Sequence, residues 1–84
     1  MIKNTKLASV NIASNGFIEI KLSKQIVEDD VVISEEPHRT GLNKGDDIDT
    51  QMQIVNEHLS ELKFPPVSAE DIEKIKTLAN AAWG

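Results

Sequence analysis

Carboxylates are the side chains in this sequence with the clearest capacity for chemistry, and three of them gather in one short run. Asp46, Asp47 and Asp49 directly follow Gly45. Clustered carboxylates can hold calcium, but an EF-hand loop needs acids at alternate positions, a central glycine and a glutamate at the twelfth position. This run lacks that spacing. Acids also favour a helix start, where they face the positive end of the helix. We therefore predict a helix start here, and we expect no metal ion and no cofactor.

Histidine is the second residue type that could do chemistry. His38 stands beside Arg39, with no nucleophile and no second metal ligand near it in the sequence. A surface or capping role suits His38, whereas His58 lies beside an apolar helical stripe and suits packing. No Ser–His–acid arrangement and no glycine-rich phosphate loop can be defended. We therefore expect that the protein is not an enzyme.

The length and composition narrow the class of protein. The 84 residues form one domain, 1–84, near the lower limit for independent folding. Cysteine is absent, which excludes disulfides and thiolate metal sites. No apolar run approaches the ~20 residues of a membrane span, and the N-terminus lacks the apolar core of a signal peptide. The net charge of −5 argues against a nucleic acid as the main partner. We expect neither a membrane nor a nucleic acid as a partner.

The charges are distributed unevenly along the chain. Residues 1–27 hold four lysines and one glutamate, whereas residues 28–49 hold eight acidic and two basic residues. A positive end and a negative middle could steer identical copies of the chain together. Both segments could equally be ordinary solvated surface, because exposed charges contribute little to stability.

Alternating apolar residues predict a three-stranded antiparallel meander over residues 1–42. In the first hairpin, a three-residue loop from Ser14 to Gly16 places all apolar residues on one shared face. Gly16 then takes the left-handed position of a bulged turn. The expected pairs are Ile12 with Ile18, Val10 with Ile20, and Ala8 with Leu22.

The second hairpin turns at Asp29 and Asp30, since aspartate tolerates turn conformations. On the core-facing side the expected pairs are Ile26 with Ile33 and Lys24 with Glu35. The opposite face then carries Val27 against Val32, with Phe17 further along it. These apolar residues fit either ordinary surface or a surface that docks another chain. Pro37 either ends the third strand or confines it to a sheet edge.

The apolar spacing changes to three and four residues after Asp49, which predicts two helices, at residues 46–63 and 68–83. Ser68 and Asp71 resemble a capping box at the second helix start, and Val67 with Ile72 fits a hydrophobic staple. The two helices should pack as a hairpin on one face of the meander, which gives an α+β fold.

Trp83 lies one residue from the end of the sequence. A large aromatic side chain in such a place is often held by a neighbouring element or by another subunit. Together with the apolar face of the sheet, it completes the set of predicted interface residues: Phe17, Val27, Val32 and Trp83.

Four short motifs, taken in order, resemble small uncharacterised proteins that bacteriophages and prophages encode. They are Gly16-Phe17-Ile18-Glu19-Ile20 in a hairpin strand, His38-Arg39 ending a strand, Gly45-Asp46-Asp47 opening a helix, and a late Ala81-Ala82-Trp83. The likeness covers residues 16–49 and Trp83. Such proteins are associated with late structural gene regions, often near tail genes. The resemblance implies no particular functional residue.

The resemblance implies a non-enzymatic structural or assembly protein of the virion, tail-associated or otherwise accessory, that acts through protein–protein contacts. Its partners would be other phage structural proteins, further copies of itself, or both. The small size of the domain, the Val27–Val32 pair and Trp83 lead us to expect a homo-oligomer. The chain would be made in the cytoplasm of the bacterial host and would end in the virion. The alternative is a small acidic regulator or inhibitor that binds a single protein partner and stays in the cytoplasm.

Overall fold

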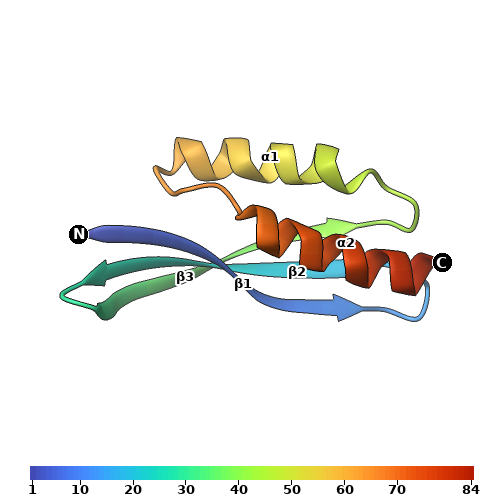
Figure 1. The fold of residues 1–84 in the computed structure, drawn as a ribbon, viewed down its shortest axis with the longest axis horizontal. Helices are drawn as coiled ribbons and strands as arrows, with labels where there is room; N and C mark the ends of the chain where they lie inside the picture. Colours follow the sequence, from blue (N-terminus) through green and yellow to red (C-terminus); the bar gives the residue numbers. More distant parts are fainter.

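The computed structural model describes residues 1–84 and has the predicted α+β architecture (Figure 1). Three antiparallel strands form a meander in the order β1-β2-β3, and two helices follow it. The elements are β1 (Ile2–Ile12), β2 (Ile18–Glu28), β3 (Val31–Leu42), α1 (Ile48–Glu61) and α2 (Ala69–Trp83). Both helices lie within the predicted ranges, and neither is long and apolar enough to cross a membrane.

The first hairpin has the predicted turn and most of the predicted register. Gly16 has a φ of 90°, the left-handed conformation expected for it in a bulged turn. The two predicted pairs nearest the turn are present, Ile12 with Ile18 and Val10 with Ile20. The predicted pairing of Ala8 with Leu22 is wrong. A bulge between Leu7 and Ser9 places Leu7 opposite Leu22, so that the larger apolar side chain packs against the core.

The second hairpin turns at the two predicted residues. Asp29 and Asp30 have φ values of 52° and 63°, as a two-residue hairpin turn requires. Val27 pairs with Val32, as predicted. An irregularity follows, in which Ile33 is an extra residue on β3, and such a bulge shifts every later pair by one position. Two predicted pairs are therefore wrong: Ile26 pairs with Ser34 in place of Ile33, and Lys24 pairs with Glu36 in place of Glu35.

Pro37 lies inside β3 and does not end it. β3 continues to Leu42 and forms one edge of the sheet. A proline is tolerated at an edge because its missing N–H need not serve a neighbouring strand. The structure thus confirms the second of the two alternatives predicted for this residue.

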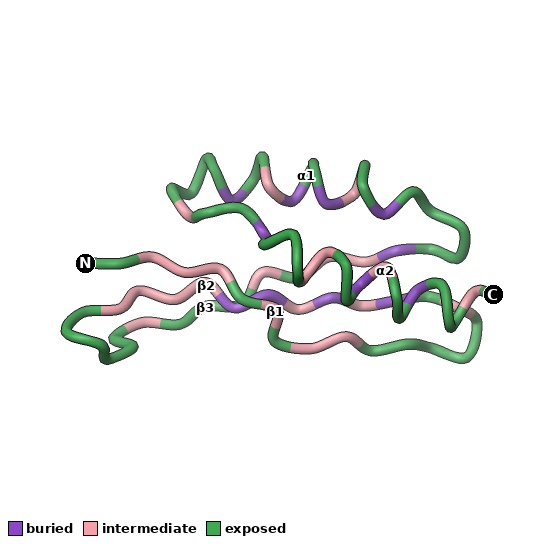
Figure 2. The backbone as a smooth tube through the Cα atoms, in the orientation of Figure 1, coloured by how far each residue is buried: buried purple, intermediate pink, exposed green.

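The core lies between the helices and one half of the sheet (Figure 2). Ile18, Ile20 and Leu22 are fully buried, and their alternation along β2 places them on the face that the helices cover. The buried apolar residues are Ile18, Ile20, Leu22, Leu42, Ile48, Met52, Val55, Leu59, Val67, Ile75 and Ala79. This is the face that the sequence predicted.

Both helices begin near the predicted residues, although the hydrogen bonds at their starts differ. Asp47 is the N-cap of α1, but its carboxylate accepts from Thr50 Oγ1 (2.6 Å) and caps no backbone N–H. At the start of α2, Ser68 Oγ accepts from Asp71 N at 3.1 Å, which is one half of the predicted capping box. The Asp71 carboxylate does not return to Ser68. It accepts from Leu7 N at 3.2 Å and so links α2 to the bulge of β1.

The connector between the helices lies against β1. Val67 is buried, and Phe64 packs against the core. The ammonium group of Lys3 lies 5.0 Å from the centre of the Phe64 ring, within cation–π distance. Thr5 Oγ1 donates to the carbonyl of Pro65 at 2.7 Å. These contacts hold the connector against the first residues of β1.

Candidate functional site

One end of the sheet forms an arm, which we define as residues 1–6 and 23–37. The tip of the arm, with the β2–β3 turn and the start of β1, projects beyond both helices (Figure 1). None of the 11 core residues belongs to the arm. The molecule measures 43 × 20 × 18 Å with a radius of gyration of 13.4 Å, against about 12 Å for a compact chain of this length. The arm is thus the part of the sheet that the core does not use.

The tip of the arm is apolar and exposed (Figure 2). Ten large hydrophobic side chains of the chain are exposed, and half of them lie at this tip. Their exposed fractions are 81% for Met1, 59% for Ile2, 60% for Val31, 47% for Val32 and 54% for Ile33. Single exposed apolar residues are common, but a contiguous group is typical of a surface that another molecule covers.

An apolar row crosses all three strands of the arm. Ile2 pairs with Val27, and Val27 pairs with Val32, so the three side chains share one sheet face. This is the face opposite Ile18, as predicted for the two valines. Ile2 was missed, because the alternation of apolar residues in β1 could be followed only from Ala8 onward, and the bulge interrupts it there.

The other two predicted interface residues lie near the first hairpin turn, Phe17 just before β2 and Trp83 at the end of α2, and both have contacts within the chain. The Phe17 ring lies over Gly41, where an added Cβ atom would come within 2.5 Å of Phe17 Cζ. Trp83 packs against the core, and its Nε1–H donates to the carbonyl of Gly16 at 2.6 Å. Trp83 was predicted to be held either by a neighbouring element or by another subunit, and in the structure a neighbouring element of the same chain holds it. The four predicted residues therefore do not form a single surface.

The three aspartates of the helix start do not converge on one point. Asp46 Oδ2 accepts from Asn43 N at 2.7 Å, which closes the turn before α1. Asp49, in the first turn of α1, forms an ion pair with Lys76 of α2 at 2.8 Å. Asp47 occupies the N-cap position of the same helix, and its carboxylate accepts from Thr50 Oγ1. Within residues 1–84 no group of three or more His, Asp or Glu side chains is arranged to hold a metal ion.

The two histidines come together in space. The rings of His38 on β3 and His58 on α1 lie 6.3 Å apart, centre to centre, in an edge-to-face arrangement. The pKa of His38 is lowered by burial and, to a smaller extent, by the nearby charges of Lys24 and His58. Neither ring forms a hydrogen bond with a serine or an acid. The pair is therefore a packing contact without the geometry of a catalytic triad.

We predict that the burial of His38 makes the stability of the fold depend on pH. The pKa of His38 lies below its ordinary value of 6.5 in the folded chain. Below pH 6.5 the unfolded chain therefore binds the proton first, and the free energy of unfolding should fall until His38 is protonated in the folded chain too. Urea unfolding at a series of pH values measures this fall, and His38→Gln should reduce it. An equal fall in His38→Gln would assign the effect to other groups.

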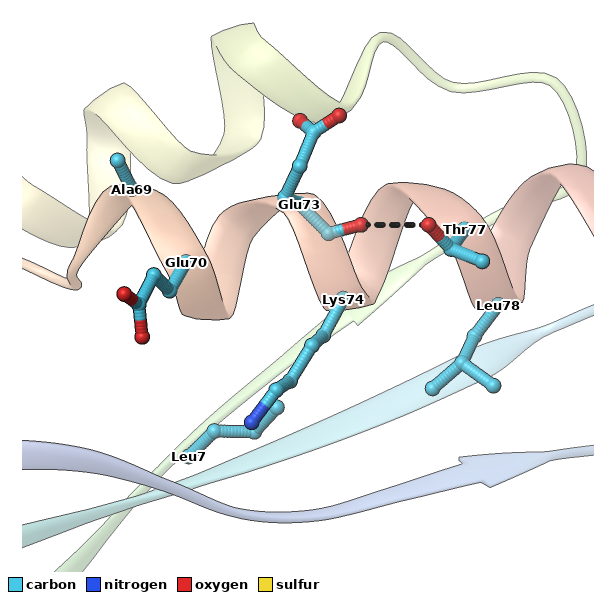
Figure 3. Close-up of a pocket in the computed structure, with 7 residues that line it drawn as sticks. All are labelled: Leu7, Ala69, Glu70, Glu73, Lys74, Thr77 and Leu78. Atoms are coloured by element: carbon cyan, nitrogen blue, oxygen red, sulfur yellow. Dashed lines mark hydrogen bonds between the residues drawn. The ribbon is translucent and has the colours of Figure 1, made fainter.

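A shallow groove of about 800 Å³ runs between α2 and β1 (Figure 3). Lys74 and Leu78 extend from α2 toward β1, whereas Glu73 points away from it. Thr77 Oγ1 donates to the Glu73 carbonyl, so its hydroxyl group is already satisfied. Small-molecule sites combine an enclosed apolar pocket with a few convergent polar groups. This groove is open and lacks such convergence, so it gives no support to an enzymatic reading.

Comparisons of the chain with models of protein families, with curated proteins and with solved structures find no match. The functional argument therefore depends on the surfaces of this molecule, and the arm is the surface with the strongest physical signal.

Proposed function

We propose that this chain is a non-enzymatic structural or assembly protein of a bacteriophage particle, and that its arm makes the contacts by which it acts. The phage assignment is supported by the motif resemblance, which covers residues 16–49 and Trp83. The chain would be made in the cytoplasm of the bacterial host and would be incorporated into the virion.

One observation carries the proposal, namely the exposed apolar tip of the arm. Met1, Ile2, Val31, Val32 and Ile33 leave apolar area in water that the small core does not use. Burying apolar surface contributes about 25 cal/mol per Å², so covering this tip with another protein is favourable. A binding role explains why the sheet extends beyond its helices and exposes apolar side chains. A catalytic role does not explain this extension.

The test is co-purification from the host that carries the gene. We expect the chain to band with intact particles in a density gradient and to remain with them after a wash at high salt, because apolar contacts are not screened by ions. A chain that stays entirely in the particle-free lysate would contradict the virion role and would favour the alternative, a small acidic regulator of one protein partner.

A further inference from the structure

The arm has two open sheet edges. The strand order β1-β2-β3 leaves the outer edges of β1 and β3 without a partner strand in the chain. Open edges carry unpaired N–H and C=O groups that can pair with a strand of another molecule. On β1 the open edge ends at Leu7, whose N–H donates to Asp71. On β3 it is interrupted at Pro37, which has no N–H. Between the tip of the arm and these points, neither edge has a backbone hydrogen bond outside the sheet, although the side chains of Lys3 and Thr5 on β1 contact the helix connector.

The two open edges carry opposite charges. Lys3 and Lys6 lie on β1, which has no acidic residue. Glu35 and Glu36 lie on β3, which has no basic residue before Pro37. None of these four side chains forms an ion pair within the chain, because the one ion pair of the structure joins Lys76 and Asp49. Two of them have other contacts within the chain: Glu35 Oε2 accepts from Gln25 Nε2 at 2.8 Å, and Lys3 lies 5.0 Å from the centre of the Phe64 ring. Neither contact neutralises a charge, so the β1 edge stays positive and the β3 edge stays negative.

The register of the sheet distributes these charges evenly over its two faces. Lys6 and Glu35 lie on one face, and Lys3 and Glu36 lie on the other, as their pairing with alternate residues of β2 requires. In both cases the lysine and the glutamate are offset by two residues along the strands. Long side chains reach across such a diagonal between neighbouring strands. Each face thus has a base at one edge and an acid at the other, and the two come within reach of each other only where a β1 edge and a β3 edge lie side by side.

We propose that copies of this chain associate head to tail, with the arm edge of β1 in one copy paired to the arm edge of β3 in the next. The inference rests on the proposed function and names the chain itself as a partner. β1 and β3 run in the same direction, since both are antiparallel to β2. A copy placed beside the first in the same orientation therefore pairs β1 with β3 as parallel strands, and each lysine meets a glutamate on its own face.

The apolar row supports the same arrangement. Ile2, Val27 and Val32 lie level with one another across the sheet. When the next copy continues the sheet in this register, its Ile2 lies beside Val32 of the first copy. The apolar row then continues across the interface between the two copies, and each copy covers exposed apolar area of the other.

Symmetric pairing of like edges is disfavoured. Two β1 edges would bring lysines together, and two β3 edges would bring glutamates together, and like charges directly opposite each other destabilise a strand pair. Head-to-tail contacts form a ring if the rotation closes and a filament if it does not. The charges of the arm therefore select an assembly with more than two copies.

The test uses two charge-reversal variants and their mixture. The first, Lys3→Glu with Lys6→Glu, makes both edges acidic. The second, Glu35→Lys with Glu36→Lys, makes both edges basic. Sedimentation velocity measures mass at high micromolar concentration, and circular dichroism checks that each variant is folded. Lys44→Glu with Lys74→Glu, which changes two exposed lysines outside the arm, matches the first variant in net charge and is its control.

We expect wild type and the control to form species larger than a dimer, and each reversal variant alone to associate at least tenfold more weakly. The equimolar mixture should recover the large species, because acidic and basic edges then alternate. A monomeric wild type, or a mixture that stops at a one-to-one dimer, would overturn the head-to-tail contact. Because this assay contains no particle, a chain that bands with particles but is monomeric alone contradicts only this inference. A chain that assembles as expected but is absent from particles contradicts only the virion role.

Discussion

Replacing Trp83 by alanine will lower the free energy of unfolding by about 2–3 kcal/mol, somewhat less than the cost of removing a fully buried aromatic side chain. The indole packs against the core from the last turn of α2, and its Nε1–H donates to the Gly16 carbonyl at 2.6 Å. The residue thus ties the end of the chain to the first hairpin turn. For a domain whose total stability is on the order of 5 kcal/mol, this is a large fraction.

Two controls separate the parts of this effect, which urea unfolding followed by circular dichroism measures. Trp83→Phe keeps most of the apolar contact and loses the hydrogen bond, so it should cost about 1 kcal/mol. Ile54→Ala removes an exposed side chain of α1 and should change stability by less than about 0.5 kcal/mol. If Trp83→Ala is as stable as wild type, the tryptophan is free of the core and returns as a candidate interface residue.

The fold was largely predictable because its local signals agree with one another. Alternation over the strands, the change to helical spacing after Asp49, and the turn residues Gly16, Asp29 and Asp30 each specify the same meander and helix pair. Such consistency between local preference and overall fold is what defines a unique structure.

The register was less predictable, because β-bulges follow from tertiary packing. The bulge beside Ala8 brings Leu7 toward the core, and the extra residue Ile33 shifts the pairs of β3. The alternation of apolar residues in a short segment does not reveal either bulge. A bulge keeps the alternation on each side of itself and changes only which residues of the neighbouring strand the two sides pair with. Each wrong pair in the prediction lies at a bulge or beyond one.

The candidate site was predicted in part, for a related reason. Val27 and Val32 are neighbours through a short turn, so local reasoning found them. Ile2 joins them from a strand 25 residues away, and Trp83 reaches the carbonyl of Gly16 from 67 residues away. Contacts between residues so far apart in the sequence cannot be inferred from the apolar pattern of either segment alone. Only the folded chain shows that Trp83 is used inside the molecule and that Ile2 is left outside it.

The central claim is that the arm is a binding surface with no part in the core, and Val32→Glu tests it most directly. Val32 is 47% exposed on the arm, and Ile54, 42% exposed on α1, offers a matched control as Ile54→Glu. Because both side chains already face water, neither change should lower the thermal midpoint by more than a few degrees. The variants should differ only in what they bind.

The measurement is the amount of each variant that bands with purified particles, relative to wild type. We predict that Val32→Glu reduces incorporation at least tenfold, because burying an unpaired carboxylate in an apolar contact is costly, and that Ile54→Glu is incorporated normally. Normal incorporation of Val32→Glu together with loss of Ile54→Glu would place the contact on the helices and contradict the account.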